Sequence, residues 1–486
     1  MIHTYQLNGY NIVLDVASGS IHNVDRTAFD AIRLFEAYNN RELGIADTAE
    51  TAGTADSAGS IGMACMAEPT IVGKIKDELT SMHPELSSSE ADELLSEIVA
   101  LIKSGKLFAP DTYCDIPPKI AGAPLKALCL NVSHLCNMRC LYCFAGKGEY
   151  GGAGGLMSPD TGKRAIDFLI ENSRDRSNLD VDFFGGEPLL NFETVKELVR
   201  YASGLGQTCG KNFRFTLTTN GLLIDDEVID FVNREIHNVV LSLDGRPETH
   251  DATRKLPGGE GSYARVVPAI KKLIDARNGR DYYIRGTFTK ANIDFVQDIL
   301  HIADLGFTEL SMEPVVSKST DDYALSTADL PELERQYELL ATEMLQRRKE
   351  GRGFSFYHYT LDLKGGPCIY KRIAGCGAGT EYMAVTPSGD LYPCHQFVGN
   401  ERFLLGDVRR GLVNKALQDE FGSADIYSRQ PCRQCWARMY CSGGCAANAY
   451  NATGSVGGIY ELGCLMFKKR IECAIMIKVA EYAEDI

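Results

Sequence analysis

Six short apolar segments alternate with helix-like stretches between residues 125 and 351, and this alternation restricts the fold more than any other feature of the chain. The segments are ALCLNVS, VDFFGG, FRFTLTT, VVLSLDG, YYIRGTF and LSMEPVV, and apolar residues recur at helical spacing between them. Strands that alternate with helices form parallel sheets with right-handed crossovers. The sequence therefore predicts an α/β fold built from six βα units.

Polar and glycine-rich stretches follow these strands directly: NVSHLCNMRC, FFGGEP, TTNG, SLDG and MEPV. In barrels of this plan the chemistry lies at the C-terminal ends of the strands, so we expect the site residues on one rim. A nucleotide-binding fold is the alternative, but neither GxGxxG nor GxxxxGK[ST] follows any of these strands. We therefore favour a partial (β/α)6 barrel.

Composition excludes several classes of protein. The 486 residues carry 50 basic and 65 acidic side chains, a formal charge of −15, which argues against a nucleic-acid partner. No run approaches the roughly 20 apolar residues of a membrane span, and the N-terminus lacks a secretory signal, so we expect a cytoplasmic protein with no membrane partner. Sixteen cysteines in a reducing compartment indicate metal, cluster or redox chemistry.

Three cysteines follow the first predicted strand with the spacing C-x3-C-x2-C: Cys136, Cys140 and Cys143. Three thiolates on one loop can ligate three irons of a [4Fe-4S] cluster and leave the fourth iron open to a small molecule. A zinc site is the alternative, with His134 as its fourth ligand. The spacing, with Tyr142 before the last cysteine, resembles the signature of the radical S-adenosylmethionine (SAM) superfamily.

This resemblance also implies a set of SAM-binding residues on the loops after the first, second and fourth strands: Tyr142, Gly185, Gly186, Glu187, Ser242, Asp244 and Arg254. In the family, a GGE motif holds the ammonium group of SAM, and later residues bind its ribose and carboxylate. Glu187 and Arg254 have the charges that such a zwitterion needs. The family's reduced cluster cleaves SAM to a 5′-deoxyadenosyl radical, which abstracts hydrogen from the substrate.

Seven further cysteines lie near the C-terminus: Cys376, Cys394, Cys432, Cys435, Cys441, Cys445 and Cys464. Seven thiols are too many for one site, and a pair of zinc knots would satisfy their spacing. The pattern resembles the SPASM domain of radical SAM peptide-modifying enzymes, which holds two auxiliary [4Fe-4S] clusters. The resemblance implies one cluster on Cys376, Cys394 and Cys445, and the other on the remaining four.

Two residues near this array leave alternatives open. Cys376, Cys394 and Cys445 leave one position on the first auxiliary cluster. Either Cys368 fills this position or it is open to substrate. In the sulfatase-maturing branch an Asp follows the second SPASM cysteine as a proposed base, but here that residue is His395, which weakens simple Ser or Cys dehydrogenation. His395 is then either a proton acceptor or a structural hydrogen-bonding group. For the isolated cysteines we predict burial as small apolar residues: Cys65, Cys114, Cys129, Cys209 and Cys473.

The N-terminal region reads as a separate α+β unit. Residues 1–43 predict two strands, with a helix from Asp25 to Tyr38 capped by Asp25, and residues 44–70 predict a flexible insertion. A second helix follows, capped by Ser88 or Ser89. This order resembles the winged-helix-like PqqD recognition element, which binds leader peptides by strand addition. An unrelated oligomerisation or capping domain is the alternative.

Domain boundaries follow from these features. We expect a recognition domain over residues 1–115, the radical SAM barrel over 122–350, a bridging region over 351–375, and the SPASM domain with a C-terminal helix over 376–486. Over nearly its whole length the chain resembles the maturases of SCIFF (six-cysteine-in-forty-five) peptides, most specifically in GCGAGTEYMAVTPSGDLYPCHQFVGN and CRQCWARMYCSGGCAANAYNATG.

The SCIFF resemblance implies formation of thioether crosslinks in a ribosomally made, Cys-rich precursor peptide with a leader. It also implies three [4Fe-4S] clusters, SAM, and a low-potential electron donor such as flavodoxin or ferredoxin. An open iron on the first auxiliary cluster would bind the substrate thiolate and accept the electron released when carbon and sulfur join. Two alternatives remain: a SPASM dehydrogenase that makes formylglycine, and a non-catalytic zinc or cluster scaffold.

Overall fold

The computed structural model describes the chain except for residues 43–67, 117–122, 153, 364–367 and 485–486. Most of the predicted insertion over residues 44–70 therefore lies outside the described residues, and so does Cys65. At the end of that range Pro69 already belongs to a helix, α3 (Pro69–Met82). Pro occupies the first turn of α3, where its missing N–H costs no hydrogen bond.

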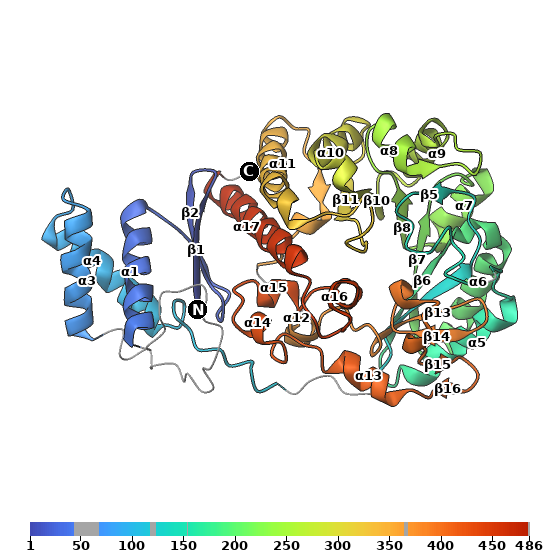
Figure 1. Cartoon of the computed structure of the whole chain (residues 1–486), viewed down its shortest axis with the longest axis horizontal. Helices are drawn as coiled ribbons and strands as arrows, with labels where there is room; N and C mark the ends of the chain where they lie inside the picture. Colours follow the sequence, from blue (N-terminus) through green and yellow to red (C-terminus); the bar gives the residue numbers. More distant parts are fainter. Residues whose placement is uncertain (43–67, 117–122, 153, 364–367, 485–486) are drawn as a thin grey trace.

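The centre of the molecule is a parallel sheet whose strands lie side by side in chain order. They are β4 (Ala127–Ser133), β6 (Asn178–Gly185), β7 (Asn212–Thr219), β8 (Asn238–Ser242), β10 (Tyr282–Phe288) and β11 (Glu309–Pro314). These are the six predicted strands, so the α/β fold with a parallel sheet is confirmed. Figure 1 shows them curving through the right-hand half of the molecule.

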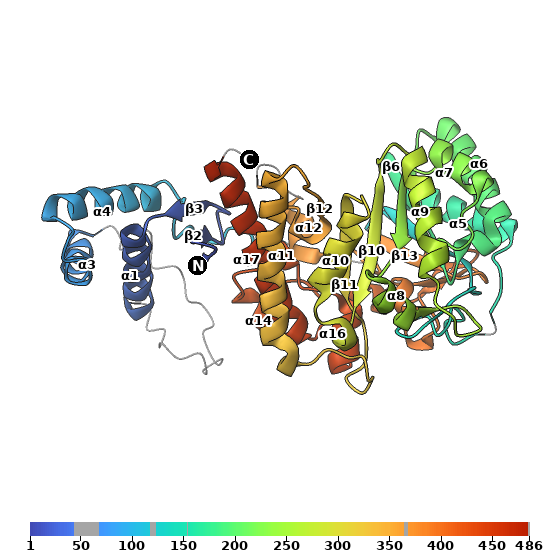
Figure 2. The same ribbon diagram turned by 90° about the horizontal axis from the view of Figure 1, so that it is seen from above.

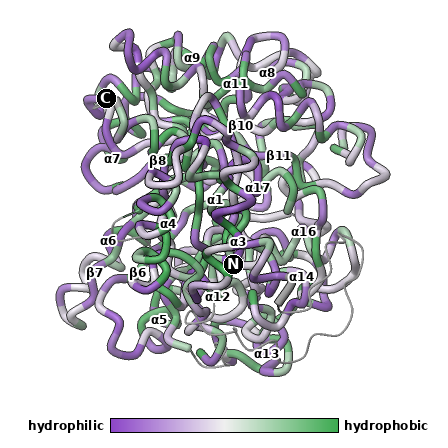
Figure 3. The backbone as a smooth tube through the Cα atoms, turned by 90° about the vertical axis from the view of Figure 1, so that its left-hand side faces the viewer, coloured by the Kyte–Doolittle hydropathy of each residue, from purple (hydrophilic) through white to green (hydrophobic). Residues whose placement is uncertain are grey.

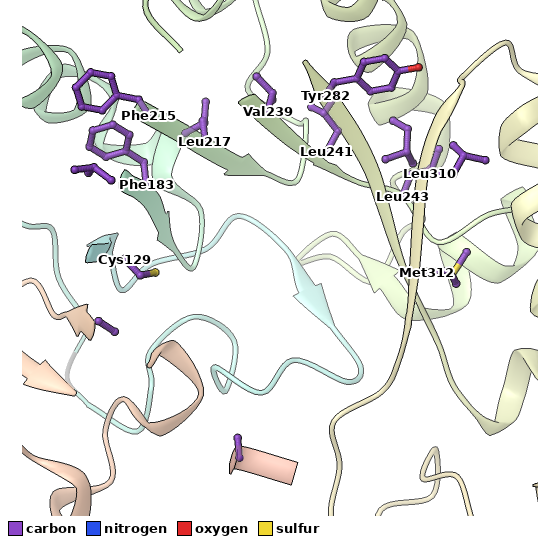
Figure 4. Close-up of a cluster of buried hydrophobic side chains, with 14 of the residues drawn as sticks. Cys129, Phe183, Phe215, Leu217, Val239, Leu241, Leu243, Tyr282, Leu310 and Met312 are labelled. Carbon is purple, nitrogen blue, oxygen red and sulfur yellow. The ribbon is translucent and has the colours of Figure 1, made fainter. Parts of the chain in front are cut away.

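Alternation along the strands separates two faces of this sheet. On β6, Leu179, Val181 and Phe183 are buried, whereas Asp182 and Phe184 are partly exposed. The buried face packs with the connecting helices in the main core, and Figure 4 shows side chains of β6, β7 and β8 gathered there. The partly exposed residues line the opposite, inner face.

Helices follow the strands and cover the outer face of the sheet (Figure 2). They are α5 (Pro159–Asn172), α6 (Phe192–Cys209), α7 (Asp226–Glu235), α8 (Pro247–Thr253), α9 (Tyr263–Ala276), α10 (Phe295–Asp304) and α11 (Leu330–Lys349). Side-chain caps begin two of them, because Ser158 accepts from Thr161 N and Asp225 accepts from Val228 N. Two-residue strands β5 (Arg139–Cys140) and β9 (Arg254–Lys255) pair outside the main sheet.

The C-terminal region extends the sheet at both edges. β12 (Ser355–Phe356) pairs with β11, so the stretch predicted as a bridging region supplies an edge strand as well as helix α12 (Ile369–Ala374). On the other edge β13 (Tyr382–Val385) pairs in parallel with β4. Strands β14 (Asp390–Tyr392), β15 (Gly406–Asp407) and β16 (Gly411–Leu412) follow in antiparallel order.

Five helices complete the C-terminal region: α13 (Lys415–Gly422), α14 (Gln430–Arg433), α15 (Arg438–Cys441), α16 (Ala446–Thr453) and α17 (Glu461–Glu484). Figure 1 shows α17 between the N-terminal hairpin and α11. Lys469 of α17 forms an ion pair with Glu338 of α11 at 2.9 Å, and the Tyr5 hydroxyl donates to Glu472 O at 2.9 Å. This helix therefore joins the N-terminal unit to the barrel.

The N-terminal unit contains a three-stranded antiparallel sheet and helices with their own apolar core. Its strands are β1 (Ile2–Leu7), β2 (Tyr10–Asp15) and β3 (Ile21–Val24), and its helices are α1 (Arg26–Glu42), α3 and α4 (Ser88–Lys103). Asp25 caps α1 as predicted, accepting from Ala28 N at 2.7 Å.

Two N-terminal predictions were wrong, and one helix was missed. The first predicted strand is a hairpin, since Asn8 and Gly9 adopt positive φ angles of 49° and 83° and form its turn. Helix α3 was not predicted. The cap of α4 is Ser87, one residue earlier than expected, because Ser87 and Glu90 form a reciprocal capping box.

Hydropathy agrees with this arrangement, since Figure 3 shows hydrophobic residues interspersed with hydrophilic ones along the helices. None of the described helices combines the length and apolar character needed to cross a bilayer.

Candidate active site

The three-cysteine loop leaves the end of β4 and is held by short backbone pairings. Cys140, on β5, pairs with Arg254 on β9, and Leu141 N donates to Thr253 O at 2.8 Å. This pairing brings the segment after β8 against the loop after β4. Residues separated by more than a hundred positions therefore share one site at the C-terminal ends of the strands.

Gly185 and Gly186 allow the turn after β6 to lie directly against the same loop. Gly186 N donates to Ser133 O at 2.7 Å, and Glu187 N donates to Leu135 O at 2.9 Å. A Cβ atom on Gly185 would lie 2.2 Å from Ser133 O, and one on Gly186 would lie 2.3 Å from Leu135 O. The two glycines are thus required by close backbone approach.

Glu187 is buried and connects the ends of β6 and β7. Its Oε1 accepts from the Thr219 hydroxyl at 2.7 Å and from Leu189 N at 3.1 Å, and its Oε2 accepts from Asn220 N at 2.9 Å. Burial raises the pKa of Glu187 to about 7, and these three donors oppose that shift.

Asn220 is a site residue that sequence reasoning missed. Its side-chain nitrogen donates to Asn137 Oδ1 at 2.8 Å and to Cys136 Sγ at 3.9 Å, so it contacts the cysteine loop directly. The signal was the sequence TTNG, which follows β7 as the other candidate segments follow their strands. It lacks a charge or thiol that would have marked it as functional.

Asp244, just after β8, is the most highly connected side chain of the site. The Tyr142 hydroxyl donates to its Oδ2 at 2.5 Å, and Thr287 N donates to its Oδ1 at 3.1 Å. Arg254 forms an ion pair with Oδ1 at 3.1 Å, and the Thr253 hydroxyl donates to Oδ2 at 2.9 Å. Burial raises the pKa of Asp244, but the charges of Arg254 and His250 and the hydrogen bonds to the carboxylate together outweigh it, and the pKa is lowered.

Arg254 is nine-tenths buried and joins this network to the thiols. Its guanidinium lies 5.6 Å from the centre of the Tyr142 ring, and Nη1 lies 3.9 Å from Cys140 Sγ. Ser242, the last residue of β8, is half-buried on the same rim. The structure thus brings together the predicted residues of all three loops.

Burial keeps two of the loop thiols protonated in the absence of a metal. It raises the pKa of Cys136 to about 11 and of Cys140 to about 12, although Arg254 lowers the latter. A bound iron would favour the thiolates. In the described part of the chain, no three His, Cys, Asp or Glu side chains are arranged to hold a metal ion, so the cluster assignment rests on the C-x3-C-x2-C spacing. His134, the candidate zinc ligand, instead stacks on Tyr150 at 4.6 Å, and burial lowers its pKa to about 4.

The C-terminal cysteines form two groups in space. We call the three thiols Cys376, Cys394 and Cys445 the first group. Burial raises the pKa of Cys394, and the charges of Cys445 and Cys376 raise it further. The second group consists of Cys432, Cys435, Cys441 and Cys464. Burial raises the pKa of Cys441 to about 12 and of Cys464 to about 11, and the neighbouring thiols of the group add to both shifts.

Cys368 lies beside the N-terminal unit. It precedes α12 and is exposed, and it lines a pocket with Ser18 and Gly19 of that unit and with Tyr440.

His395 extends from the C-terminal region to the three-cysteine loop. Its ring centre lies 5.5 Å from that of Phe144, which follows Cys143, and 5.0 Å from that of Phe184 at the end of β6. Its Nδ1 lies 3.4 Å from the Tyr382 hydroxyl. Burial lowers the pKa of His395 to about 4, so its ring is neutral at physiological pH.

Predictions for the isolated cysteines were correct in two cases. Cys129 and Cys473 are buried, whereas Cys114 and Cys209 are exposed. Cys209 is the last residue of α6, and Cys114 lies in the segment that leads from the N-terminal unit to the barrel. The predictions for Cys114 and Cys209 failed because a single cysteine does not indicate whether its position in the fold is exposed.

Comparison with known proteins identifies two domains. Residues 130–290 match the model of the radical SAM superfamily, and residues 376–436 match that of the SPASM iron-sulfur cluster-binding domain. The chain therefore contains a radical SAM domain followed by a SPASM domain. These domains imply a [4Fe-4S] cluster that acts with SAM, together with auxiliary clusters in the SPASM part.

Curated relatives include a radical SAM synthase and a maturase. The radical SAM cyclopropyl synthase TigE of Paramaledivibacter caminithermalis is 22% identical over 71% of this chain and 73% of its own length. The mycofactocin maturase MftC of Mycolicibacterium smegmatis is 28% identical over 66% of this chain and 78% of its own length.

Two solved structures share the fold. Native anSMEcpe with bound AdoMet superposes with a TM-score of 0.62 at 21% identity, covering 75% of this chain and all of that one. Streptococcus suis SuiB bound to the precursor peptide SuiA covers 94% of this chain and 97% of that one, with a TM-score of 0.50 at 16% identity.

Proposed function

We propose that this protein is a radical SAM enzyme that forms intramolecular thioether crosslinks in a ribosomally made, Cys-rich peptide. The observation that carries the proposal is the position of His395 between Phe144 and Phe184, because it links the first cysteine group to the loop of Cys136, Cys140 and Cys143. A peptide bound at the rim would contact both parts of the molecule at once. The relatives TigE and MftC support a peptide substrate.

In this proposal Cys136, Cys140 and Cys143 hold the SAM-binding cluster. Gly185, Gly186 and Glu187 would hold the amine of SAM, and Ser242 and Arg254 would hold its ribose and carboxylate. Asp244 and Tyr142 then act as positioning residues, since Asp244 holds both the Tyr142 hydroxyl and the Arg254 guanidinium. When bound, the cluster and SAM supply the carbon-centred radical that removes hydrogen from the peptide.

The first cysteine group is proposed to hold an auxiliary cluster with one open position. The pocket that Cys368 lines with Ser18 and Gly19 of the N-terminal unit supports this, because Cys376, Cys394 and Cys445 are not among the residues that line it. A cysteine of the substrate would then complete the ligand set and lose its proton on binding. The second group, with four thiols, would hold the other auxiliary cluster.

Thioether formation removes two hydrogens and two electrons from the peptide overall. One hydrogen atom would leave the carbon, and the thiol would contribute its proton and, as the C–S bond forms, an electron, for which an auxiliary cluster held by the first group would be the acceptor. A low-potential flavodoxin or ferredoxin supplies the electron that cleaves SAM. The formylglycine alternative is less favoured because neutral His395 stands where that branch has a carboxylate.

The N-terminal unit is proposed to bind the leader of the peptide by strand addition at β3. β1 is covered by α17, through His3 and Tyr5, so β3 is the free edge. Since Asp15 N donates to Ser20 O, alternate residues Ile21 and Asn23 direct their N–H groups away from β2. A groove lies along this edge, bounded by β3, Leu363 and the end of α17.

The test is anaerobic reconstitution with iron, sulfide, SAM, reductant and a synthetic Cys-rich peptide, followed by mass spectrometry. The expected product has lost two hydrogens for each ring, retains all its sulfur, and resists alkylation at the linked cysteines. Loss of sulfur from the peptide would instead favour the dehydrogenase. An unmodified peptide with a colourless, zinc-containing protein would overturn the proposal.

A further inference from the structure

Arg285 has an unusual position for an arginine. It is the central residue of β10, between β8 and β11, and its side chain is 49% exposed although its neighbours Ile284 and Gly286 are buried. Alternation places it on the inner face of the sheet with Tyr283 and Thr287. A half-exposed side chain in the middle of a parallel sheet means that the inner face is open to solvent at this point.

The neighbours of Arg285 belong to the candidate active site. Its register partner on β8 is Ser242, and its partner on β11 is Ser311. Arg285 therefore lies on the inner face of the sheet, next to a residue of the proposed SAM-binding rim.

Among the described residues, the guanidinium pairs with one carboxylate, and only at long range. Its nearest carboxylate is Glu313, at 3.9 Å, which is too long for a hydrogen bond. Glu313 itself pairs with His358 Nε2 at 3.1 Å, and the charge of Arg470 contributes to lowering the pKa of Glu313. Among the described residues, none accepts a hydrogen bond from the Arg285 side chain, so its five N–H donors remain available for a ligand.

We propose that Arg285 binds a carboxylate of the substrate peptide and thereby sets the depth at which the peptide enters the barrel. The planar fork of N–H donors matches the two oxygens of a carboxylate, whereas a thiolate or carbonyl offers one acceptor atom. This inference rests on the proposed function, since it assumes a peptide substrate. The carboxylate belongs either to an Asp or Glu side chain or to the peptide C-terminus.

Arg285→Gln and Arg285→Lys test the inference in the full-length, reconstituted enzyme. Arg214→Gln is the matched control, because Arg214 is also exposed on a central strand and pairs with Asp180 at 3.9 Å. Loss of a charged, forked contact should raise the KM for the Cys-rich peptide on the order of ten- to a hundredfold, with a smaller change in kcat. Peptide-independent cleavage of SAM should be unchanged in all three variants.

Peptide variants identify the carboxylate. A peptide with a C-terminal amide and one with Asn and Gln in place of Asp and Glu are compared with the parent. The peptide that lacks the bound carboxylate should reproduce the loss in the wild-type enzyme, and Arg285→Gln should add nothing further to it. Fluorescence anisotropy of the labelled peptides measures the same differences as affinity, without turnover.

The outcomes separate this inference from the proposed function. A wild-type enzyme that binds the peptide but never modifies it contradicts the proposed function, while the anisotropy comparison still decides the role of Arg285. Equal peptide affinity for wild type and Arg285→Gln overturns the inference. A variant that loses peptide-independent SAM cleavage also overturns it, because Arg285 would then contact SAM.

Discussion

Asp244 shows how much of the site depends on one buried carboxylate. It holds the Tyr142 hydroxyl and Arg254, which in turn contacts Cys140. Asp244→Asn leaves Arg254 buried without its counter-charge, so we expect a loss of about 3–5 kcal/mol in stability together with slow SAM cleavage. Asp180→Asn, at a partly exposed carboxylate, is the control for chemical denaturation. An Asp244→Asn protein as stable and active as wild type would exclude this positioning role.

Replacing Cys445 and replacing Cys368 should have different effects on the iron content of the protein. Cys445 lies with Cys376 and Cys394, whereas Cys368 lies beside the N-terminal unit. We therefore expect Cys445→Ala to lose about four of roughly twelve irons and Cys368→Ala to lose none. Exposed Cys209 gives a matched control in Cys209→Ala. Equal iron loss in the Cys368 and Cys445 variants would mean that Cys368 is a cluster ligand.

At the residue scale, local motifs were predictable and long-range partners were not. The cysteine spacing, GGE and Arg254 were visible because short sequences encode them. Asn220 was missed, because its contact with Cys136 depends on the order of β4, β6 and β7. The hydrogen bond from Tyr142 to Asp244 likewise joins the loop after β4 to the loop after β8, with β6 and β7 between them, so no local pattern indicates it.

At the element scale, the six strands were predictable because each is a short run rich in apolar or β-branched residues between stretches of helical periodicity. The two-residue strands β5 and β9 were not, since two residues carry no periodicity. The hairpin turn at Asn8 and Gly9 had a recognisable signal, and it was overlooked in favour of a longer strand. Strand β13 beside β4 follows from tertiary pairing alone.

The free edge of β3 gives a prediction at this scale. Asn23→Pro removes an outward N–H without removing a bond to β2, so the sheet should remain folded while strand addition is impaired. We expect affinity for a leader-bearing peptide to fall about tenfold, from the lost hydrogen bond and the altered edge. Affinity for a leaderless peptide should not change, and Asn23→Ala should bind both as wild type does. Unimpaired leader binding by Asn23→Pro would rule out β3 as the docking strand.

At the scale of the whole molecule, three parts meet around one site. Strand β13 continues the barrel sheet from β4 into the SPASM region, and His3 of β1 stacks on Trp436 at 3.7 Å, beside Cys435. Asp111 forms an ion pair with buried Arg438 at 2.9 Å, which secures the segment after the N-terminal unit. Removal of the whole unit would expose these groups, so single edge variants are the cleaner test of peptide recognition.

The central claim is that the site between the barrel and the SPASM region removes a hydrogen atom from a bound peptide. A Cys-rich peptide built from perdeuterated amino acids tests it directly, with wild type and Cys140→Ala compared under reducing, anaerobic conditions. We predict that 5′-deoxyadenosine formed by the wild-type enzyme carries deuterium and that Cys140→Ala forms none. Unlabelled 5′-deoxyadenosine from the wild-type enzyme, at any extent of peptide binding, would contradict the account.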